Sequence, residues 1–143
     1  METGKMINRI SNRLRRRSRA IQEAIGISGA QGNILDYILI ESPSHSVYQK
    51  EIEQEFGLRP STATEALKSL EMQGLIRREP EEHDGRYKRI VFTEKAAEIK
   101  SALRGQIQES EALLLRGISE AEKEEFLRIA ARMLENLDSD SQA

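Results

Sequence analysis

Apolar residues recur at intervals of three and four along most of this chain, which is the spacing of amphipathic helices. Between residues 6 and 25 this stripe consists of Ile7, Ile10, Leu14, Ile21 and Ile25. Arg17 and Ser18 fall where the stripe should continue, and Gly26 breaks the pattern. The sequence therefore predicts a first helix over residues 6–25 whose apolar face is interrupted once.

Two shorter helices are predicted next, each opened by a capping pair. Ser28 with Gln31, and Ser46 with Gln49, each place a glutamine three residues after a serine, as in a capping box. The apolar residues of these two helices are Ile34, Leu35, Ile38 and Leu39, followed by Ile52 and Phe56. Pro43 and Gly57 are the expected stops, since proline cannot continue a helix and glycine suits a left-handed C-terminal position.

A fourth helix is predicted to begin at Pro60, because the first turn of a helix needs no N–H from that residue. Its apolar face consists of Ala63, Ala66, Leu67 and Leu70. The residues left facing outward are Ser61, Thr62, Thr64, Glu65 and Lys68. Two helices joined by a tight turn are thus predicted, the second of which presents short hydroxyl side chains and a lysine.

The segments LIRRE and KRIVFT alternate apolar with charged residues, and the turn signal Asp84-Gly85 lies between them. We predict a two-stranded hairpin with a charged tip. The basic residues near this tip are Arg86, Lys88 and Arg89. Because Glu81, Glu82 and Asp84 are also present, the tip is not a simple phosphate clamp. We expect Asp84 to hold one arginine of the hairpin in place.

Two helices are predicted in the last third of the chain. One begins at Thr93 with Gly105 in its middle, and the other follows the capping pair Ser119 and Glu122. Their apolar stripe consists of Ile99, Leu103, Ile107, Leu114, Phe126, Ile129, Met133 and Leu137. These residues would be exposed in a monomer, so the pattern favours a homodimer.

Together these elements predict a mainly α fold with a small β-hairpin wing, in which a winged helix-turn-helix is flanked by helices for dimerisation. One helix fits the major groove of B-DNA, and short side chains such as Ser61, Thr62 and Thr64 let its backbone approach the base edges. Lys68 can reach a base or a phosphate. The helix N-termini near Ser46 and Pro60 offer N–H groups to phosphate oxygens.

The stretch VYQKEIEQEFGLRPSTATEALKSLEMQGLIRREPEEHDGRYKRIVFTEKA resembles the DNA-binding core of the MarR (multiple antibiotic resistance regulator) family. Its most specific elements are STAT, LEMQGLIRR and the Asp84-Gly85-Arg86 tip. This chain departs from the family pattern at Glu65, at Ala96 with Ala97, and in having no visible aromatic-rich ligand pocket.

The resemblance implies one domain over residues 1–143, with a winged-helix core at 28–94 and dimerisation helices at 6–25 and 95–137. It further implies a homodimer on a near-palindromic double-stranded DNA operator, often released by a small anionic or phenolic effector, and so a repressor. The DNA-binding residues predicted from pattern and resemblance are Ser46, Gln49, Arg59, Pro60, Ser61, Thr62, Thr64, Lys68, Arg86 and Lys88.

Charge is distributed unevenly along the 143 residues, although 22 Lys and Arg nearly balance 24 Asp and Glu. Seven basic residues precede residue 21 with Glu2 as the only acid there. We expect these cations to form a solvated face, to pair with acids of a partner's C-terminal helices, or to contact phosphate. For Arg17 two interpretations stay open: its stem packs and its head reaches water or a carboxylate, or it binds the carboxylate of an effector.

The amino-acid composition excludes or disfavours several other classes of protein and site. The absence of cysteine excludes disulfides and thiolate chemistry, and with His45 and His83 far apart we expect no metal site and no cofactor. No apolar run approaches a membrane span, so we expect a cytoplasmic protein. No nucleophile–base pair is visible, which disfavours an enzyme. The main alternative is a winged-helix module that binds a protein through its acidic surface instead of duplex DNA.

Overall fold

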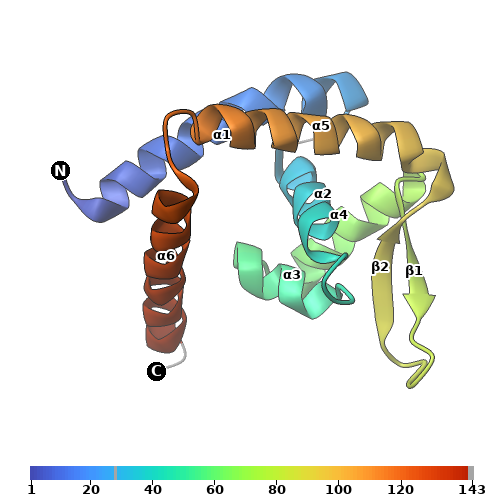
Figure 1. Cartoon of the computed structure of the whole chain (residues 1–143). Helices are drawn as coiled ribbons and strands as arrows, with labels where there is room; N and C mark the ends of the chain where they lie inside the picture. The colour runs from blue at the N-terminus through green and yellow to red at the C-terminus, as the bar shows by residue number, and fades with distance from the viewer. Residues whose placement is uncertain (28, 142–143) are drawn as a thin grey trace. The chain divides into compact units, whose positions relative to one another are not determined.

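The computed structural model describes residues 1–27 and 29–141 and confirms a mainly helical fold with one two-stranded hairpin (Figure 1). Its elements are α1 (Thr3–Ile25), α2 (Gly29–Glu41), α3 (Gln49–Phe56), α4 (Pro60–Met72), β1 (Ile76–Pro80), β2 (Lys88–Phe92), a 3₁₀ turn (Glu94–Ala96), α5 (Ala97–Leu114) and α6 (Glu120–Ser141). Ser28, the expected cap of the second helix, lies outside the described residues.

The chain forms two compact units, Met1–Ile107 and Gln108–Ala143. The first unit has one hydrophobic core that α2, α3, α4 and the hairpin share. Its largest fully buried side chains are Ile34, Leu35, Ile38, Val47, Ile52, Leu67, Leu70, Ile76, Ile90 and Leu103. These residues are the apolar positions of the helical and alternating patterns, so the stripes of the sequence became the core.

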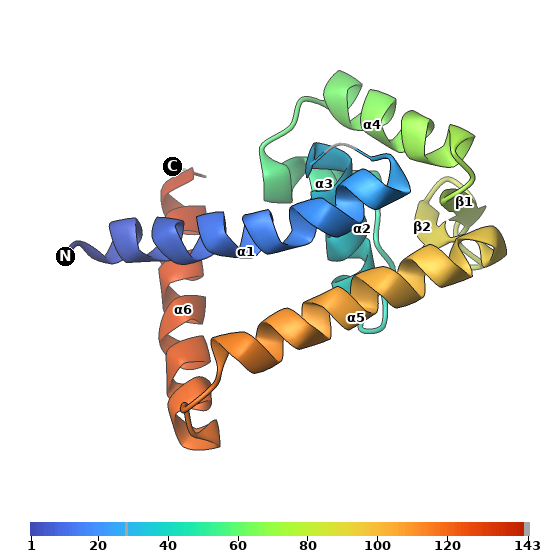
Figure 2. The ribbon, with the colours of Figure 1, turned by 90° about the horizontal axis from the view of Figure 1, so that it is seen from above.

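Helix α1 packs against α2 and crosses it in the view of Figure 2. Gln22 is buried against Gly32, and a Cβ added to Gly32 would lie 2.2 Å from Nε2 of Gln22. The interruption at Arg17 and Ser18 also has a structural role. Ser18 is half-buried and its hydroxyl donates to Oε1 of Gln106 on α5 at 3.3 Å, whereas Arg17 is exposed. The apolar stripe is thus replaced locally by a polar bridge between two helices.

Helix α3 does not begin at the expected cap. The prediction of Ser46 as N-cap was wrong: the N-cap residue is Tyr48, whose backbone N–H donates to Oε1 of Glu51 at 3.0 Å. The backbone at Ser46 is not yet helical, and its side chain has another partner, described below. The stop at Gly57 is confirmed, with φ 62°, and Pro60 occupies the first turn of α4 as expected.

Strands β1 and β2 pair antiparallel, with Ile76 opposite Phe92 and Glu79 opposite Arg89. The segment before α3 joins them, because the N–H of Ile90 donates to the carbonyl of Val47 at 2.8 Å. The middle of β2 is therefore hydrogen-bonded directly to the segment that precedes α3. The Asp84-Gly85 turn is confirmed at the tip, where the N–H of Tyr87 donates to the carbonyl of Asp84 at 3.1 Å.

The expectation that the apolar stripe of the last two helices is exposed in a single chain is wrong for α5. Leu103 is only 2% exposed in the single chain, and Ile99 and Ile107 pack against the same core, so this part of α5 needs no partner subunit to bury its apolar face. The second unit differs. Its Ser119 and Glu122 form the predicted capping box, yet none of the described residues of α6 is buried.

Residues 1–27 and 29–141 contain neither a membrane-spanning helix nor a metal-binding cluster. None of the helices there combines the length and the apolar character that crossing a bilayer requires. In the same residues, no three His, Cys, Asp or Glu side chains gather closely enough to hold a metal ion.

Candidate nucleic-acid interface

The outward face of α4 is open to solvent in the first unit. Five of the predicted DNA-binding residues at its start and along this face are exposed, namely Arg59, Pro60, Ser61, Thr62 and Lys68. The N-cap residue of α4, Arg59, makes no side-chain cap, and Pro60 has no N–H. The N–H groups of the next residues in the first turn therefore receive no hydrogen bond from the N-cap side chain. Such a turn attracts anions, as the phosphates of a nucleic acid would require.

Two other predicted residues, Gln49 and Thr64, bind each other. The side-chain amide of Gln49 donates to Oγ1 of Thr64 at 2.9 Å, and Thr64 donates its own proton to the carbonyl of Pro60 at 2.8 Å. Gln49 is also 3.0 Å from Oε2 of Glu53. These bonds fix α3 against α4, and they leave Thr64 half-buried with its hydroxyl proton already in use.

At the wing tip, Arg86 is held by the acid that the sequence indicated. Its Nη2 lies 2.8 Å from Oδ2 of Asp84 and its Nε lies 3.1 Å from Oδ1, while the side chain is 87% exposed. The Arg86 guanidinium lowers the pKa of Asp84 below its usual value, so the acid stays charged and the pairing persists at neutral pH. An exposed cation with restricted orientation is thereby presented at the tip, and Lys88 is exposed beside it.

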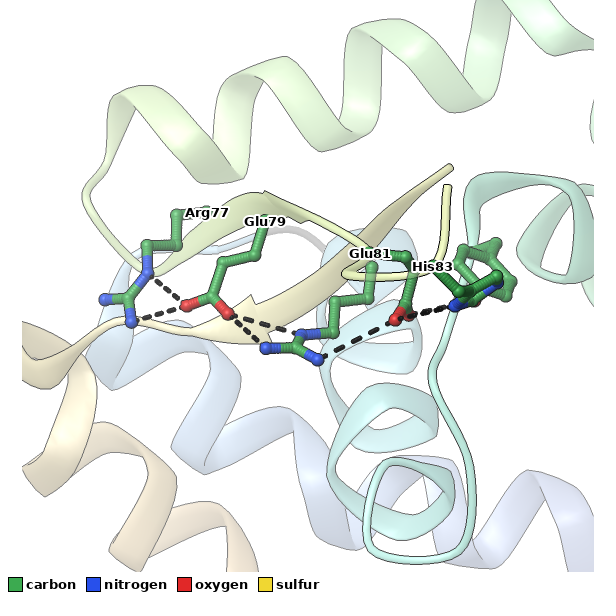
Figure 3. Close-up of polar contacts among 6 residues, drawn as sticks. Arg77, Glu79, Glu81 and His83 are labelled. Atoms are coloured by element: carbon green, nitrogen blue, oxygen red, sulfur yellow. Dashed lines mark hydrogen bonds and ion pairs between the residues drawn. The ribbon is translucent and has the colours of Figure 1, made fainter. Parts of the chain in front are cut away.

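Four of the other wing charges form a row of ion pairs along the hairpin, namely Arg77, Glu79, Arg89 and Glu81 (Figure 3). Glu79 accepts from Nη2 of Arg77 at 2.7 Å on one side and from Nη2 of Arg89 at 2.8 Å on the other. Nη1 of Arg89 is also 3.8 Å from Oε2 of Glu81. Arg89 was expected among the tip cations, but it lies opposite Glu79 in the hairpin and pairs with it. That pairing was available in principle from hairpin register, since residues opposite each other interact.

Glu81 ends this row of charges and connects the wing to the start of α3. Its side chain is only 8% exposed, and Tyr48 donates its hydroxyl to Oε1 at 2.9 Å. Hydrogen bonds from the Ser46 and Tyr48 hydroxyls hold the pKa of Glu81 below its usual value. Ser46, predicted to contact DNA, thus directs its hydroxyl to the wing. No local pattern indicated this link, because the partners are more than 30 residues apart.

We expect Glu81→Gln to weaken DNA binding about 3- to 10-fold, because a neutral amide cannot hold both Arg89 and the two hydroxyls and the wing loses its fixed orientation. Fluorescence anisotropy with operator DNA measures this effect. Glu82→Gln is the matched control, since it removes the same charge from an exposed neighbour and should leave affinity equal or slightly higher. Equal effects of the two substitutions would show that only charge matters here.

Arg17 remains the residue predicted for an effector. Its side chain is exposed on α1. The other basic residues of α1 that were expected to meet either a partner subunit or phosphate are also exposed, among them Arg9, Arg13 and Arg16.

Comparison with known proteins gives consistent matches. A family model described as the MarR family matches residues 25–86, which include α2, α3, α4, β1 and the wing tip. The helix-turn-helix-type transcriptional regulator YybA of Bacillus subtilis (strain 168) is 29% identical over 102 residues, which are 71% of this chain and 67% of that protein.

Solved structures share the fold over nearly the whole chain. The transcription regulator MarR from Oenococcus oeni superposes with a TM-score of 0.76 at 25% identity, covering 94% of this chain and 99% of that one. A MarR family regulator from Listeria monocytogenes, solved in complex with a 26mer DNA, gives a TM-score of 0.80 at 22% identity over 98% of this chain and 91% of that one. Residues 25–86 of this chain are thus similar to the MarR family, and solved transcription regulators share its fold over nearly the whole chain.

Proposed function

We propose that this protein is a sequence-specific double-stranded DNA-binding transcription regulator, a ligand-responsive repressor that acts as a homodimer on a near-palindromic operator. The observation that carries the proposal is the exposed face of α4 beside a wing whose Arg86 is held outward by Asp84. A relative with the same fold, the Listeria monocytogenes regulator, was crystallised with DNA. This role is regulatory and not catalytic, and it places the protein in the cytoplasm with its DNA.

The paired acids of the wing weaken the alternative of an acidic protein-binding surface. Glu79 is neutralised by Arg77 and Arg89, and Asp84 by Arg86. Glu81 is largely buried. These acids are therefore held in ion pairs or buried, and they do not form an acidic surface open to a protein partner.

The homodimer is supported by the exposed apolar side chains of the second unit. On α6 these are Phe126, Leu127, Ile129, Leu134 and Leu137. A contiguous set of this kind on a water-facing helix marks an interface. A twofold dimer would present two α4 helices about 34 Å apart, which matches successive major grooves on one side of a duplex.

The test is a titration of labelled upstream DNA at several salt concentrations. We expect tight binding at low salt that weakens steeply as salt rises, because cations such as Lys68 and Arg86 displace counterions from phosphates. No measurable binding at low salt, with and without candidate effectors, would refute DNA binding.

A separate experiment tests the effector. Anionic and phenolic compounds that raise the melting temperature of the protein and release the DNA would identify the effector class, and Arg17→Ala tests the residue proposed to bind the effector.

A further inference from the structure

Helix α4 has two acidic residues, and only one of them is neutralised within the chain. Glu71, near the end of the helix, accepts from Nε of Arg78 at 3.1 Å. Glu65, in the middle, is exposed and makes no hydrogen bond or ion pair with any other described residue. Since the wing acids Glu79 and Asp84 are paired as well, Glu65 stands out as an unpaired carboxylate on the surface proposed to face DNA.

Glu65 lies at the centre of that surface. Ser61, Glu65 and Lys68 are spaced by four and three residues, so they share one face of the helix. Thr64, which lies beside them, has its hydroxyl committed to Pro60 and Gln49 and offers mainly its methyl group. The polar atoms that α4 can present at mid-helix therefore come chiefly from Glu65 and Lys68.

A carboxylate in a major groove is repelled by phosphates and can only accept hydrogen bonds. The donors on base edges there are the N4 amino group of cytosine and the N6 amino group of adenine. On its own major-groove edge adenine places the acceptor N7 beside its amino group, which suits an amide and repels a carboxylate, whereas the edge of cytosine itself presents only the N4 donor. The electrostatics thus favour cytosine as the partner of an ionised glutamate.

We propose that Glu65 is a specificity-determining residue that accepts a hydrogen bond from the N4 amino group of one cytosine in each half of the operator. The inference rests on the proposed DNA-binding function and adds to it a base at the centre of each half-site. The repulsion between Glu65 and the phosphates makes a site without this cytosine bind more weakly, so the acid contributes discrimination and lowers general affinity for DNA.

The experiment selects duplexes from a randomised operator library with the wild-type homodimer and with Glu65→Ala and Glu65→Gln. We expect the wild type to enrich a C·G pair at one position of each half-site about tenfold over other pairs. Glu65→Ala should lose this enrichment while binding unrelated DNA severalfold more tightly at low salt. Glu65→Gln should shift the preference at that position towards A·T, because an amide pairs with the N6 and N7 atoms of adenine.

Glu82→Gln serves as the matched control, because it removes one exposed acid from the wing and should leave general affinity equal or slightly higher without changing any base preference. An unchanged base profile for Glu65→Ala, or loss of preference at a position that is not C·G, would overturn the assignment. If instead the wild type selects no sequence and binds no duplex, the proposed function itself fails. Circular dichroism confirms that each variant is folded before selection.

Discussion

Phe126→Glu should convert the protein to a monomer and lower operator affinity by at least about 100-fold. Phe126 is 60% exposed on α6, in a helix whose described residues are all unburied. Burying a phenylalanine between subunits contributes about 2 kcal/mol, and a glutamate at the same position places a charge in an apolar contact. A monomer holds one half-site and loses the gain from two linked contacts. Sedimentation equilibrium and DNA titration measure the two effects.

Ser139→Glu is the matched control for this substitution. It adds the same side chain to the same helix, at a position on the opposite side from the stripe that contains Phe126, Met133 and Leu137. We expect it to leave a dimer with unchanged operator affinity. A Phe126→Glu variant that sediments as a dimer would show that α6 is outside the interface and that the subunits join elsewhere.

Arg86→Ala should weaken operator binding roughly 10- to 100-fold while leaving the dimer intact. Arg86 is the exposed wing cation that Asp84 orients through two contacts, so little side-chain entropy is lost when it meets the phosphate backbone or the minor groove. The slope of log affinity against log salt should become shallower by about one for each phosphate contact removed. Titrations at four or more salt concentrations give both quantities.

Two further variants separate charge from position. Arg128→Ala removes one cation from α6, where Arg128 pairs with Glu125, and should not change DNA binding. Arg86→Lys keeps the charge but cannot make the two-point contact with Asp84, so it should fall between the wild type and Arg86→Ala. Loss of the dimer on Arg86→Ala would instead place this part of the hairpin at a subunit contact.

Local signals predicted most elements of the fold. Gly57 and Pro60 marked the turn between α3 and α4, and Asp84 with Gly85 marked the hairpin tip. The partner of Arg86 was also predictable, since Asp84 is two residues away and within reach of the same turn. In each case the interaction joins residues that are close in the sequence, so their spacing along the chain predicts it.

Contacts between residues far apart in the sequence could not be predicted from these local signals. Ser46 was predicted to cap a helix, but it and Tyr48 bind Glu81 of the wing instead. The burial of Leu103 was missed, because nothing in the stripe of α5 tells whether the core of its own subunit or a partner covers it. Ser18 appeared to interrupt the stripe of α1, yet it bonds to Gln106.

The sequence alone determined the order of the helices and strands, through periodicity, capping and backbone preference. It also determined the turn before the recognition helix and the outward position of the short side chains on that helix. Only the tertiary structure decided which polar groups stay free to meet DNA. Thr64, Arg89 and Ser46 are engaged within the fold, whereas Glu65 and Lys68 are left exposed. The physical reason is that a hydrogen bond or ion pair depends on which side chains packing brings within about 3 Å, a distance that spacing along the chain does not encode.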